Sequence, residues 1–358
     1  MTRRVTMDDV AARAGVSKYA VSKALSGQSG VSEQTRERIL GVATDLGYVQ
    51  QRRLHGRYER SGSAAIGLAG RDKRSVMVLM PNIRLQSLDS HYWGRIVDGI
   101  AQALNARNLF MIIATEYSHE GWSSIFNAEE LIGVIVVGTI SGPMLQEVST
   151  MALPVVMVDH EDERFVCDMV FADNVDGAGR MASHLLGVGH ERLQFVGDVH
   201  FSRSFHERWL GVRLVLESRG VAWRQDQRLL GVYSPVWETT RDELVKIFND
   251  LRSEGGMPTA FLCANDDLAL ATVSALTQLG LRVPEDVSVT GFDNIEDAEV
   301  CNPPLTTMNV VKEELGERAV EMVLRRRDNP STMFEKVFLF TELIQRGSVA
   351  SPLSVGTV

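Results

Sequence analysis

Polar side chains suited to binding a small molecule follow apolar runs that are typical of buried strands. They are Asp159, Asn265, Asp266 and Asp293, and Arg208 adds a guanidinium group from a predicted helix. Ligands of open α/β sheets lie beyond the carboxyl ends of the strands, so we expect these residues to line a binding site. Together they can form paired hydrogen bonds with ring hydroxyls or with a carboxylate. The alternative is that Asn265 or Asp266 caps the following helix and Asp293 stabilises a turn, and both roles can coexist.

The sequence contains no convincing catalytic or metal-binding motif. His190-Glu191 and His206-Glu207 begin like a zinc-binding helix, but Gln194 and Leu210 occupy the positions of the second ligand. A G-x-x-x-x-G-K-[S/T] phosphate loop, a G-x-G-x-x-G turn opening a βαβ unit and a G-x-S-x-G turn are all missing. The three cysteines are far apart and are expected to be reduced, mostly buried thiols. We therefore expect no catalytic residue, no metal and no cofactor.

Two short helical patterns joined at Gly15 stand near the start of the chain. Thr6 begins a capping box, Gly15 can end the first helix in left-handed backbone, and Ser17 caps the second helix. A third pattern starts at the cap Ser32, so we predict one small three-helix core. Such a core could be a DNA-binding headpiece, and the alternative is a three-helix bundle that binds other proteins. The polar residues on the outward face of the second helix are Lys18, Tyr19, Ser22 and Lys23.

Charge divides the chain into two unlike parts. Residues 1–74 carry 14 Lys and Arg against 7 Asp and Glu, a net charge of +7, whereas the remainder carries 23 against 39, a net charge of −16. The basic part can release counterions from DNA, and the acidic part would be repelled by it. Neither a run of signal-peptide type nor an apolar stretch of membrane-spanning length occurs, so we expect a cytoplasmic protein without a membrane partner.

Beyond residue 74, apolar runs of strand length alternate with helical patterns. This alternation is typical of parallel sheets with helices on both faces. The number of strand–helix units is larger than one sheet usually contains. We therefore predict an α/β body of two Rossmann-like subdomains that face each other across a cleft. The predicted strands are 75–81, 110–115, 133–137, 155–159, 193–197, 260–264 and 288–292, and the predicted helices are 93–107, 176–187, 208–219 and 267–280.

Residues 5–27 read Val-Thr-x-x-Asp-Val-Ala-x-x-Ala-Gly-Val-Ser-x-x-x-Val-Ser-x-Ala-Leu-x-Gly. With Val31-Ser32-Glu33 and Leu46-Gly47-Tyr48, this pattern closely resembles the helix-turn-helix headpiece of the LacI/GalR family of transcription regulators. The resemblance implies that the second helix lies in the major groove of a double-stranded DNA operator. The residues implied to read bases are Lys18, Tyr19 and Lys23, and those implied to contact or orient toward phosphates are Thr6, Ser17, Ser22 and Ser32.

The body resembles the same family through segments that occur in the family's order. They include Asp173-Asn174-x-x-Gly177, Arg208-x-x-Gly211, Asn265-Asp266 and Gly291-Phe-Asp-Asn294. The resemblance implies a periplasmic-binding-protein-like fold, a homodimer, and contacts of Arg208, Asn265 and Asp293 with an inducer or corepressor. Crossovers between the subdomains are expected near Asp173, Pro303 and Pro330.

We therefore predict three parts of the chain. A DNA-binding domain spans 1–58, a hinge or linker 59–74, and an effector-binding and dimerisation domain 75–350. Within the last, one subdomain takes 75–172 with 304–330, and the other takes 173–303 with 331–350.

Two segments depart from the family pattern. Where relatives commonly have Asn-Pro-Phe-Phe, this chain has Ser90-His91-Tyr92-Trp93. Trp93 could stack on a sugar ring or a planar ligand, or pack between helix and sheet, and Tyr92 joins it as a candidate ligand contact. The usual hinge leucine is replaced by Arg57. Leu54 could act as the minor-groove wedge in a shifted register, or Arg57 and its basic neighbours could enter the groove, or the linker could be a disordered tether.

The function predicted from these patterns is a DNA-binding transcriptional regulator of repressor type, controlled by a small carbohydrate-like effector in the cleft. The alternative is a sugar-binding or sugar-metabolising α/β protein whose N-terminal bundle serves protein contacts. Binding to an operator distinguishes the two.

Overall fold

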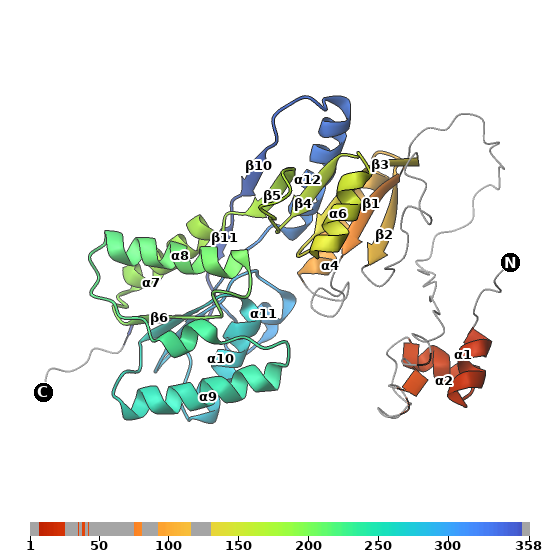
Figure 1. The fold of residues 1–358 in the computed structure, drawn as a ribbon. Helices are drawn as coiled ribbons and strands as arrows, with labels where there is room; N and C mark the ends of the chain where they lie inside the picture. Colours follow the sequence, from red (N-terminus) through yellow and green to blue (C-terminus); the bar gives the residue numbers. More distant parts are fainter. Residues whose placement is uncertain are drawn as a thin grey trace, which may run out of the picture. The chain divides into compact units, whose positions relative to one another are not determined.

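The computed structural model describes residues 7–25, 35, 38–39, 42, 75–80, 92–115 and 130–352. The chain divides into two compact units, the headpiece (1–68) and the body (69–358) (Figure 1). In these described ranges, none of the helices has both the length and the apolar character needed to cross a bilayer. Thr6, Ser32, Leu54 and Arg57 lie outside the described residues, as does the side chain of Ser22.

The headpiece contains helices α1 (Met7–Ala14) and α2 (Lys18–Leu25). Val10 of α1 and Val21 of α2 are fully buried, because the two helices pack against each other. Gly15 has φ +65°, the left-handed backbone expected at a helix end. The hydroxyl of Ser17 accepts a hydrogen bond from the Ala20 amide at 3.2 Å, so the predicted turn and cap are confirmed. Of the third predicted helix, too few residues are described to test it.

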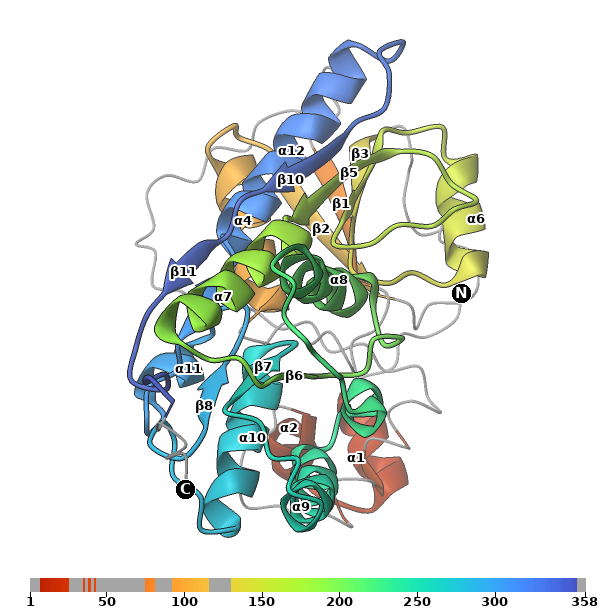
Figure 2. The same ribbon diagram turned by 90° about the vertical axis from the view of Figure 1, so that its left-hand side faces the viewer.

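The first lobe of the body is a parallel sheet of six strands in the order β10-β5-β4-β3-β1-β2. Strand side chains alternate between its two faces. Val76 and Val78 join the core with α4 and α12, whereas Met77 and Leu79 join the core with α6 (Figure 2). The elements of this lobe are β1 (Ser75–Met80), α4 (Trp93–Asn105), β2 (Phe110–Thr115), β3 (Leu131–Val137), α6 (Gly142–Thr150), β4 (Val155–Val158), β5 (Asp168–Ala172), α12 (Lys312–Asp328) and β10 (Lys336–Leu339).

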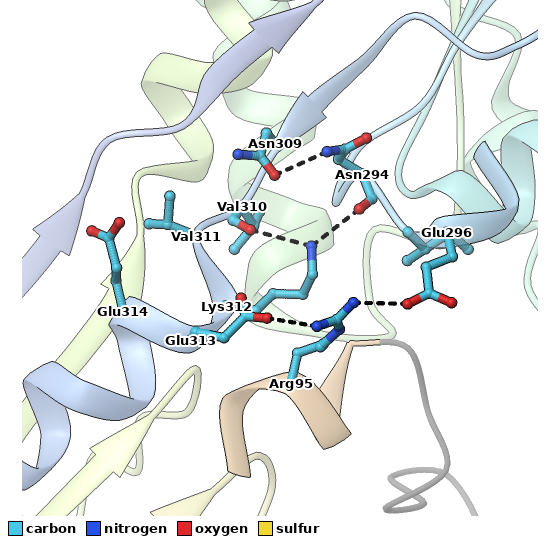
Figure 3. A pocket seen from close by; sticks show the side chains of 10 residues that line it. Arg95, Asn294, Glu296, Asn309, Val310, Val311, Lys312, Glu313 and Glu314 are labelled. Carbon is cyan, nitrogen blue, oxygen red and sulfur yellow. Dashed lines mark hydrogen bonds and ion pairs between the residues drawn. The ribbon is translucent and has the colours of Figure 1, made fainter. Parts of the chain in front are cut away.

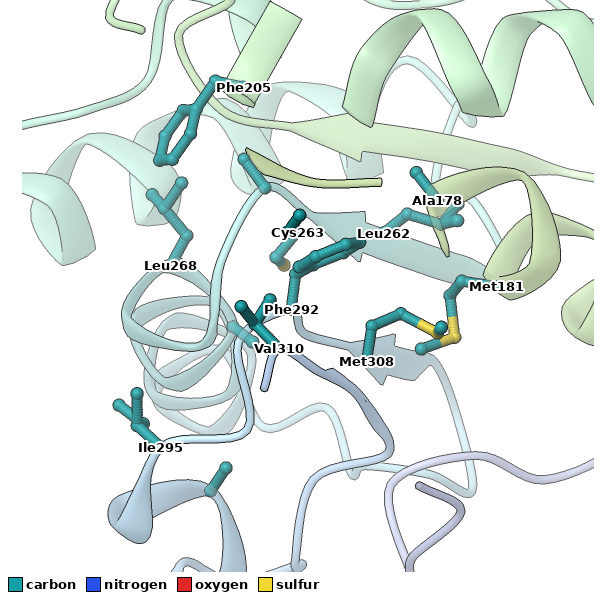
Figure 4. Close-up of a cluster of buried hydrophobic side chains, with 14 of the residues drawn as sticks. Ala178, Met181, Phe205, Leu262, Cys263, Leu268, Phe292, Ile295, Met308 and Val310 are labelled. Carbon is teal, nitrogen blue, oxygen red and sulfur yellow. The ribbon is translucent and has the colours of Figure 1, made fainter. Parts of the chain in front are cut away.

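The second lobe has a parallel sheet in the order β6-β7-β8 and an antiparallel pair, β9 with β11. Helices α7 and α8 pack together, and so do α9 and α10. Its core gathers Leu262, Phe292, Met308 and Met181, among others (Figure 4). The elements are α7 (Asn174–Val188), β6 (Leu193–Val196), α8 (Arg203–Ser218), η2 (Gln227–Gly231), α9 (Trp237–Ser253), β7 (Ala260–Cys263), α10 (Asp266–Gln278), β8 (Ser288–Thr290), α11 (Glu296–Val300), β9 (Thr307–Asn309) and β11 (Glu342–Ile344).

The chain crosses between the lobes three times, and two of the expected positions are wrong. The crossing after β5 lies at Asp173 as predicted. The second follows Asn309 instead of Pro303, because β9 pairs with β11 in the second lobe. The third follows β10 instead of Pro330, because Lys336 pairs with Met169 in the first sheet. Prolines mark local turns, whereas long-range pairing decides the lobe to which a strand belongs, so segment 331–339 belongs to the first lobe.

Close helix crossings explain several glycines of the sequence motifs. A Cβ on Gly316 of α12 would lie 2.2 Å from the carbonyl oxygen of Ile96 on α4. A Cβ on Gly211 of α8 would lie 2.2 Å from the carbonyl oxygen of Val175 on α7. Both helix pairs therefore approach more closely than any side chain allows.

Candidate functional site

Arg208 lies on α8 with its guanidinium group buried; only 3% of the residue is exposed. Its Nε donates to Asn174 Oδ1 at 2.9 Å, its Nη1 to the carbonyl oxygen of Ala264 at 2.7 Å, and its Nη2 to Asp293 Oδ1 at 2.8 Å. The ring of Phe292 lies 3.9 Å from its Cζ. Arg208 thus joins the start of α7 to the carboxyl ends of β7 and β8, at the edge where a ligand of this fold class binds.

Asp293 follows β8 in left-handed backbone, with φ 106°. Burial raises the pKa of its carboxyl group, and the charges of Arg208 and Lys312 oppose that rise. The ammonium group of Lys312 donates to the carbonyl oxygens of Asp293, Asn294 and Val310. Its burial lowers the pKa of Lys312. The lysine therefore anchors the backbone at Asp293 from the first residue of α12.

Asp159 follows β4 in the first lobe and accepts a hydrogen bond from the hydroxyl of Tyr92 at 3.3 Å. Burial raises the pKa of Asp159 to about 7, with contributions from Asp293 and Glu207 and opposition from Arg208. Burial and the carboxylates of Asp159 and Asp293 also raise the pKa of Tyr92. The charges of Arg208 and Asp293 in the second lobe thus act on Asp159 in the first lobe, and a shared ligand site of the three residues stays a prediction.

Asn265 and Asp266 have different positions, although they are adjacent. Asn265 is the N-cap of α10, where its side chain accepts a hydrogen bond from the Leu268 amide at 3.0 Å. Asp266 is almost fully buried and accepts from the Ile295 amide at 2.9 Å and from the Thr307 hydroxyl at 2.6 Å. One oxygen of Asp266 therefore holds the segment after β8 and the other holds the start of β9, while a ligand contact of Asp266 stays a prediction.

Tyr92 and Trp93 stand at the start of α4. Their rings meet edge to face, with centroids 4.9 Å apart and planes at 88°. Both are partly buried and pack against the main core. Trp93 thus fulfils the packing alternative, while its remaining exposed surface leaves the stacking role open to test.

Three residues of this site were not predicted from the sequence. Asn174 donates to Glu207 Oε2 at 3.0 Å and accepts from Arg208. Glu207 also accepts from Arg203 at 2.6 Å, so the His206-Glu207 pair rejected as a zinc motif contributes a carboxylate to this network. Lys312 is the third. The motif Asp173-Asn174-x-x-Gly177 already contained a signal for Asn174.

Ion pairs connect the two lobes at the margins of this site. Arg95 of α4 donates to Glu296 of α11 at 2.7 Å and to Glu313 of α12 at 3.2 Å (Figure 3). These residues line a cavity of about 270 Å³ beside Lys312. In a second bridge, Arg203 of α8 and Lys336 of β10 both pair with Glu161, which follows β4.

The headpiece presents its predicted DNA-reading residues on α2. Tyr19 is 70% exposed, and Lys18 is also exposed. The ammonium nitrogen of Lys23 lies 5.1 Å from the centre of the Tyr19 ring. Aromatic and basic groups on one short helix offer stacking, hydrogen bonding and positive charge to a polyanion.

Among the residues that the structure describes, no group of three His, Cys, Asp or Glu side chains is placed to hold a metal ion. The buried cysteines are far from nucleophilic, because burial raises the pKa of Cys167 and of Cys263 to about 12. The side chains around Arg208 and Asp293 provide charge and hydrogen bonds with which a ligand could be bound.

Two family models match this chain. Residues 6–51 match the bacterial regulatory proteins of the lacI family, and residues 182–349 match a periplasmic binding protein-like domain. Among curated proteins, the HTH-type transcriptional repressor MelR of Bacillus subtilis (strain 168) is 27% identical, with 96% of this chain and 97% of the relative covered. The HTH-type transcriptional repressor CytR of Escherichia coli (strain K12) is also 27% identical, with 96% of each covered.

Solved structures agree with the fold. A complex of the transcriptional regulator CelR with cellobiose is similar with a TM-score of 0.66 and 26% identity, over 96% of this chain and 100% of that one. The lac repressor dimer bound to operator has a TM-score of 0.62 and 24% identity, over 97% and 100%. The headpiece match, the body match and relatives that align over their full length agree with the resemblance found in the sequence. The chain combines a headpiece of the lacI family with a periplasmic binding protein-like body, and its relatives are LacI/GalR-type transcription regulators.

Proposed function

We propose that the protein is a transcriptional repressor that binds a DNA operator as a homodimer and responds to a small ligand in the cleft between its lobes. The observation that carries the proposal is the exposed basic and aromatic face of α2, in a chain that matches named repressors over nearly its whole length. Since its partner is DNA, the protein would act in the cytoplasm. Its role would be binding, without catalysis.

Operator binding provides the direct test of this proposal. An operator is first selected from a random duplex library, and its affinity is then measured by fluorescence anisotropy at several salt concentrations. Lys18→Ala and Lys23→Ala should each weaken specific binding by roughly tenfold, the loss that corresponds to about 1.4 kcal/mol. Lys246 is exposed on α9 of the body, so Lys246→Ala is the matched control and should have no effect. If the protein selects no sequence, or if all three variants behave alike, the repressor proposal fails.

The effector would lie between Asp159 of the first lobe and the Arg208–Asp293 pair of the second. Tyr92 and Trp93 would contribute ring surface, and Asn265 a polar group beside its capping role. A sugar or sugar derivative fits a site with carboxylates, a guanidinium group and aromatic rings. The solved relative CelR was found with cellobiose, which supports this class of ligand. Asp266 would act indirectly, by holding the segment that carries Asp293.

Ligand binding would change DNA binding through the angle between the lobes. A ligand that contacts both lobes stabilises one lobe angle relative to another. More of the dimers then adopt the stabilised arrangement. The shift changes the spacing of two headpieces on a two-fold operator. The anisotropy assay repeated with ligand gives the sign of the effect, induction or corepression.

We propose two alternative DNA contacts for the hinge, which lies outside the described residues. Either Leu54 wedges into the minor groove, or Arg57 contributes a groove contact instead. Leu54→Ala should reduce both operator affinity and DNA bending if the wedge exists. If only Arg57→Ala weakens binding, the arginine version holds.

A further inference from the structure

The cations around the proposed ligand site are already partnered. Arg208 is paired with Asp293, and Arg203 with Glu161 and Glu207. Lys312 donates to three main-chain oxygens. An anionic ligand arriving at this site would therefore have to displace an existing carboxylate partner or accept a shared cation.

Asp159 differs from the other carboxylates of the site. In the described ranges, no Arg, Lys or His forms an ion pair with it, and the hydroxyl of Tyr92 at 3.3 Å is its one hydrogen-bond donor. Burial is the main cause of the rise of its pKa to about 7; the charge of Arg208 opposes the rise, and the carboxylates of Asp293 and Glu207 add to it. Asp159 is thus a carboxyl group at the cleft that lacks a strong partner.

A polar atom without a partner belongs to the residue that follows Asp159 in the sequence. The Nε2 atom of His160 is buried and has no hydrogen bond to any residue that the structure describes. Burial lowers the pKa of His160, so its ring is neutral at physiological pH and can accept or donate one hydrogen bond at that atom. Asp159 and His160 are thus two consecutive residues after β4 whose side chains lack a strong hydrogen-bond partner.

We propose that Asp159 sets the charge of the ligand: the cleft takes polyhydroxy ligands that are neutral or carry an amine, and rejects those that bear a phosphate or a carboxylate. A hydroxyl or ammonium group would give Asp159 the donor that it lacks. A ligand anion would face Asp159 with no cation reserved for it, and repulsion of this kind is an effective means of discrimination. The proposal rests on the proposed function, because it assumes that the ligand lies in this cleft.

The test compares matched ligands that differ in charge alone. Several parent hexoses and disaccharides are screened at pH 8, above the pKa of Asp159, by thermal shift and then by calorimetry, each with its amino sugar, its uronic acid and its 6-phosphate. For any parent that binds, the amino derivative should bind at least as tightly, and both anionic derivatives about tenfold more weakly or worse. An anionic derivative that binds more tightly than its parent overturns the proposal.

Variants assign the effect to Asp159. Asp159→Asn should reduce the discrimination against the anions by about tenfold relative to the wild-type protein. Glu163→Gln, which removes one charge from the exposed part of the same loop, is the matched control and should leave the ratio unchanged. An unchanged ratio in Asp159→Asn overturns the proposal.

The outcome is separable from the proposed DNA-binding function. If operator binding is intact and no neutral or amino ligand produces a shift, the inference about the ligand is wrong while the DNA-binding function stands. If ligands bind as expected and no operator is selected, the ligand inference stands and the repressor function fails.

Discussion

Arg208 and Asp293 form a buried ion pair at 2.8 Å although 85 residues separate them in the sequence. The pair joins α8 to the segment that follows β8, and the same guanidinium group holds Asn174. Two secondary-structure elements of the second lobe are therefore held in register at the point where a ligand would bind. Removal of either partner leaves a buried charge without compensation.

We expect Arg208→Met to lower the free energy of unfolding by about 3–5 kcal/mol, because Asp293 loses its partner. The double variant Arg208→Met/Asp293→Asn should be less destabilised than the sum of the single variants. Urea denaturation followed by circular dichroism measures all four proteins. Additive losses would contradict a direct energetic coupling of the two residues.

A pair of glycine variants tests the close packing of helices. Gly316→Ala should destabilise the protein by about 1–3 kcal/mol, because the added methyl group would meet the backbone of α4. Gly187→Ala is the matched control: it lies in α7 with no atom within 4 Å of the added Cβ. Because Ala has a higher helix propensity than Gly, Gly187→Ala should raise the free energy of unfolding by up to about 1 kcal/mol. Thermal denaturation gives the sign of each effect, and equal losses in both variants would contradict the packing argument.

The pKa of Asp159 makes the stability depend on pH. Burial raises it from 3.8 to about 7, so the folded state holds the proton more tightly than the unfolded chain does. The stability contributed by Asp159 is complete below about pH 4 and is lost as the pH rises through 7. Arg208, Asp293, Glu207 and Tyr92 are the charged and titratable groups that act on it.

The measurement is the difference in unfolding free energy between Asp159→Asn and the wild-type protein from pH 5.5 to pH 8.5. Taking this difference cancels the contributions of the buried histidines. As the pH rises, the unfolding free energy of Asp159→Asn should increase relative to that of the wild-type protein, by at most about 1.4 kcal/mol per pH unit. Glu163→Gln should give a flat difference. A flat difference for Asp159→Asn as well would show that its carboxyl group titrates normally.

The sequence was informative where function depends on the carboxyl ends of strands. Asp159 and Asp293 were predicted because a residue just after a strand has a fixed position at the edge of the sheet, whereas Arg208 was predicted from the motif that it shares with the family. Asp266 obeys the same rule but points into hydrogen bonds with Ile295 and Thr307, which only the packed structure defines.

Other features depend on contacts between distant segments. Lys312 at the start of a helix resembles a surface lysine, and its burial results from carbonyl oxygens of Asp293, Asn294 and Val310 that converge on it. The lobe to which β10 belongs depends on its pairing with β5, a segment more than 160 residues away. Local composition contains no information about either contact.

The bridge from Arg95 to Glu296 offers a test of lobe motion. Arg95 pairs with Glu296 in the other lobe and with Glu313 in its own lobe. Both acidic side chains are exposed, at 68% and 39%, so each pair adds little to stability. A change of lobe angle would break the first pair and spare the second.

Glu296→Gln should therefore change the affinity for a cleft ligand by up to about fivefold, the equivalent of about 1 kcal/mol, with the thermal midpoint of the free protein nearly constant. Glu313→Gln removes the same charge from the same arginine and should leave the ligand affinity unchanged. Calorimetric titration of the three proteins with one ligand measures both values. If Arg95 bridges the lobes in one arrangement only, the loss of Glu296 alone should change the ligand affinity. Equal changes of affinity in the two variants would contradict this, because they would show that Arg95 responds to any nearby charge.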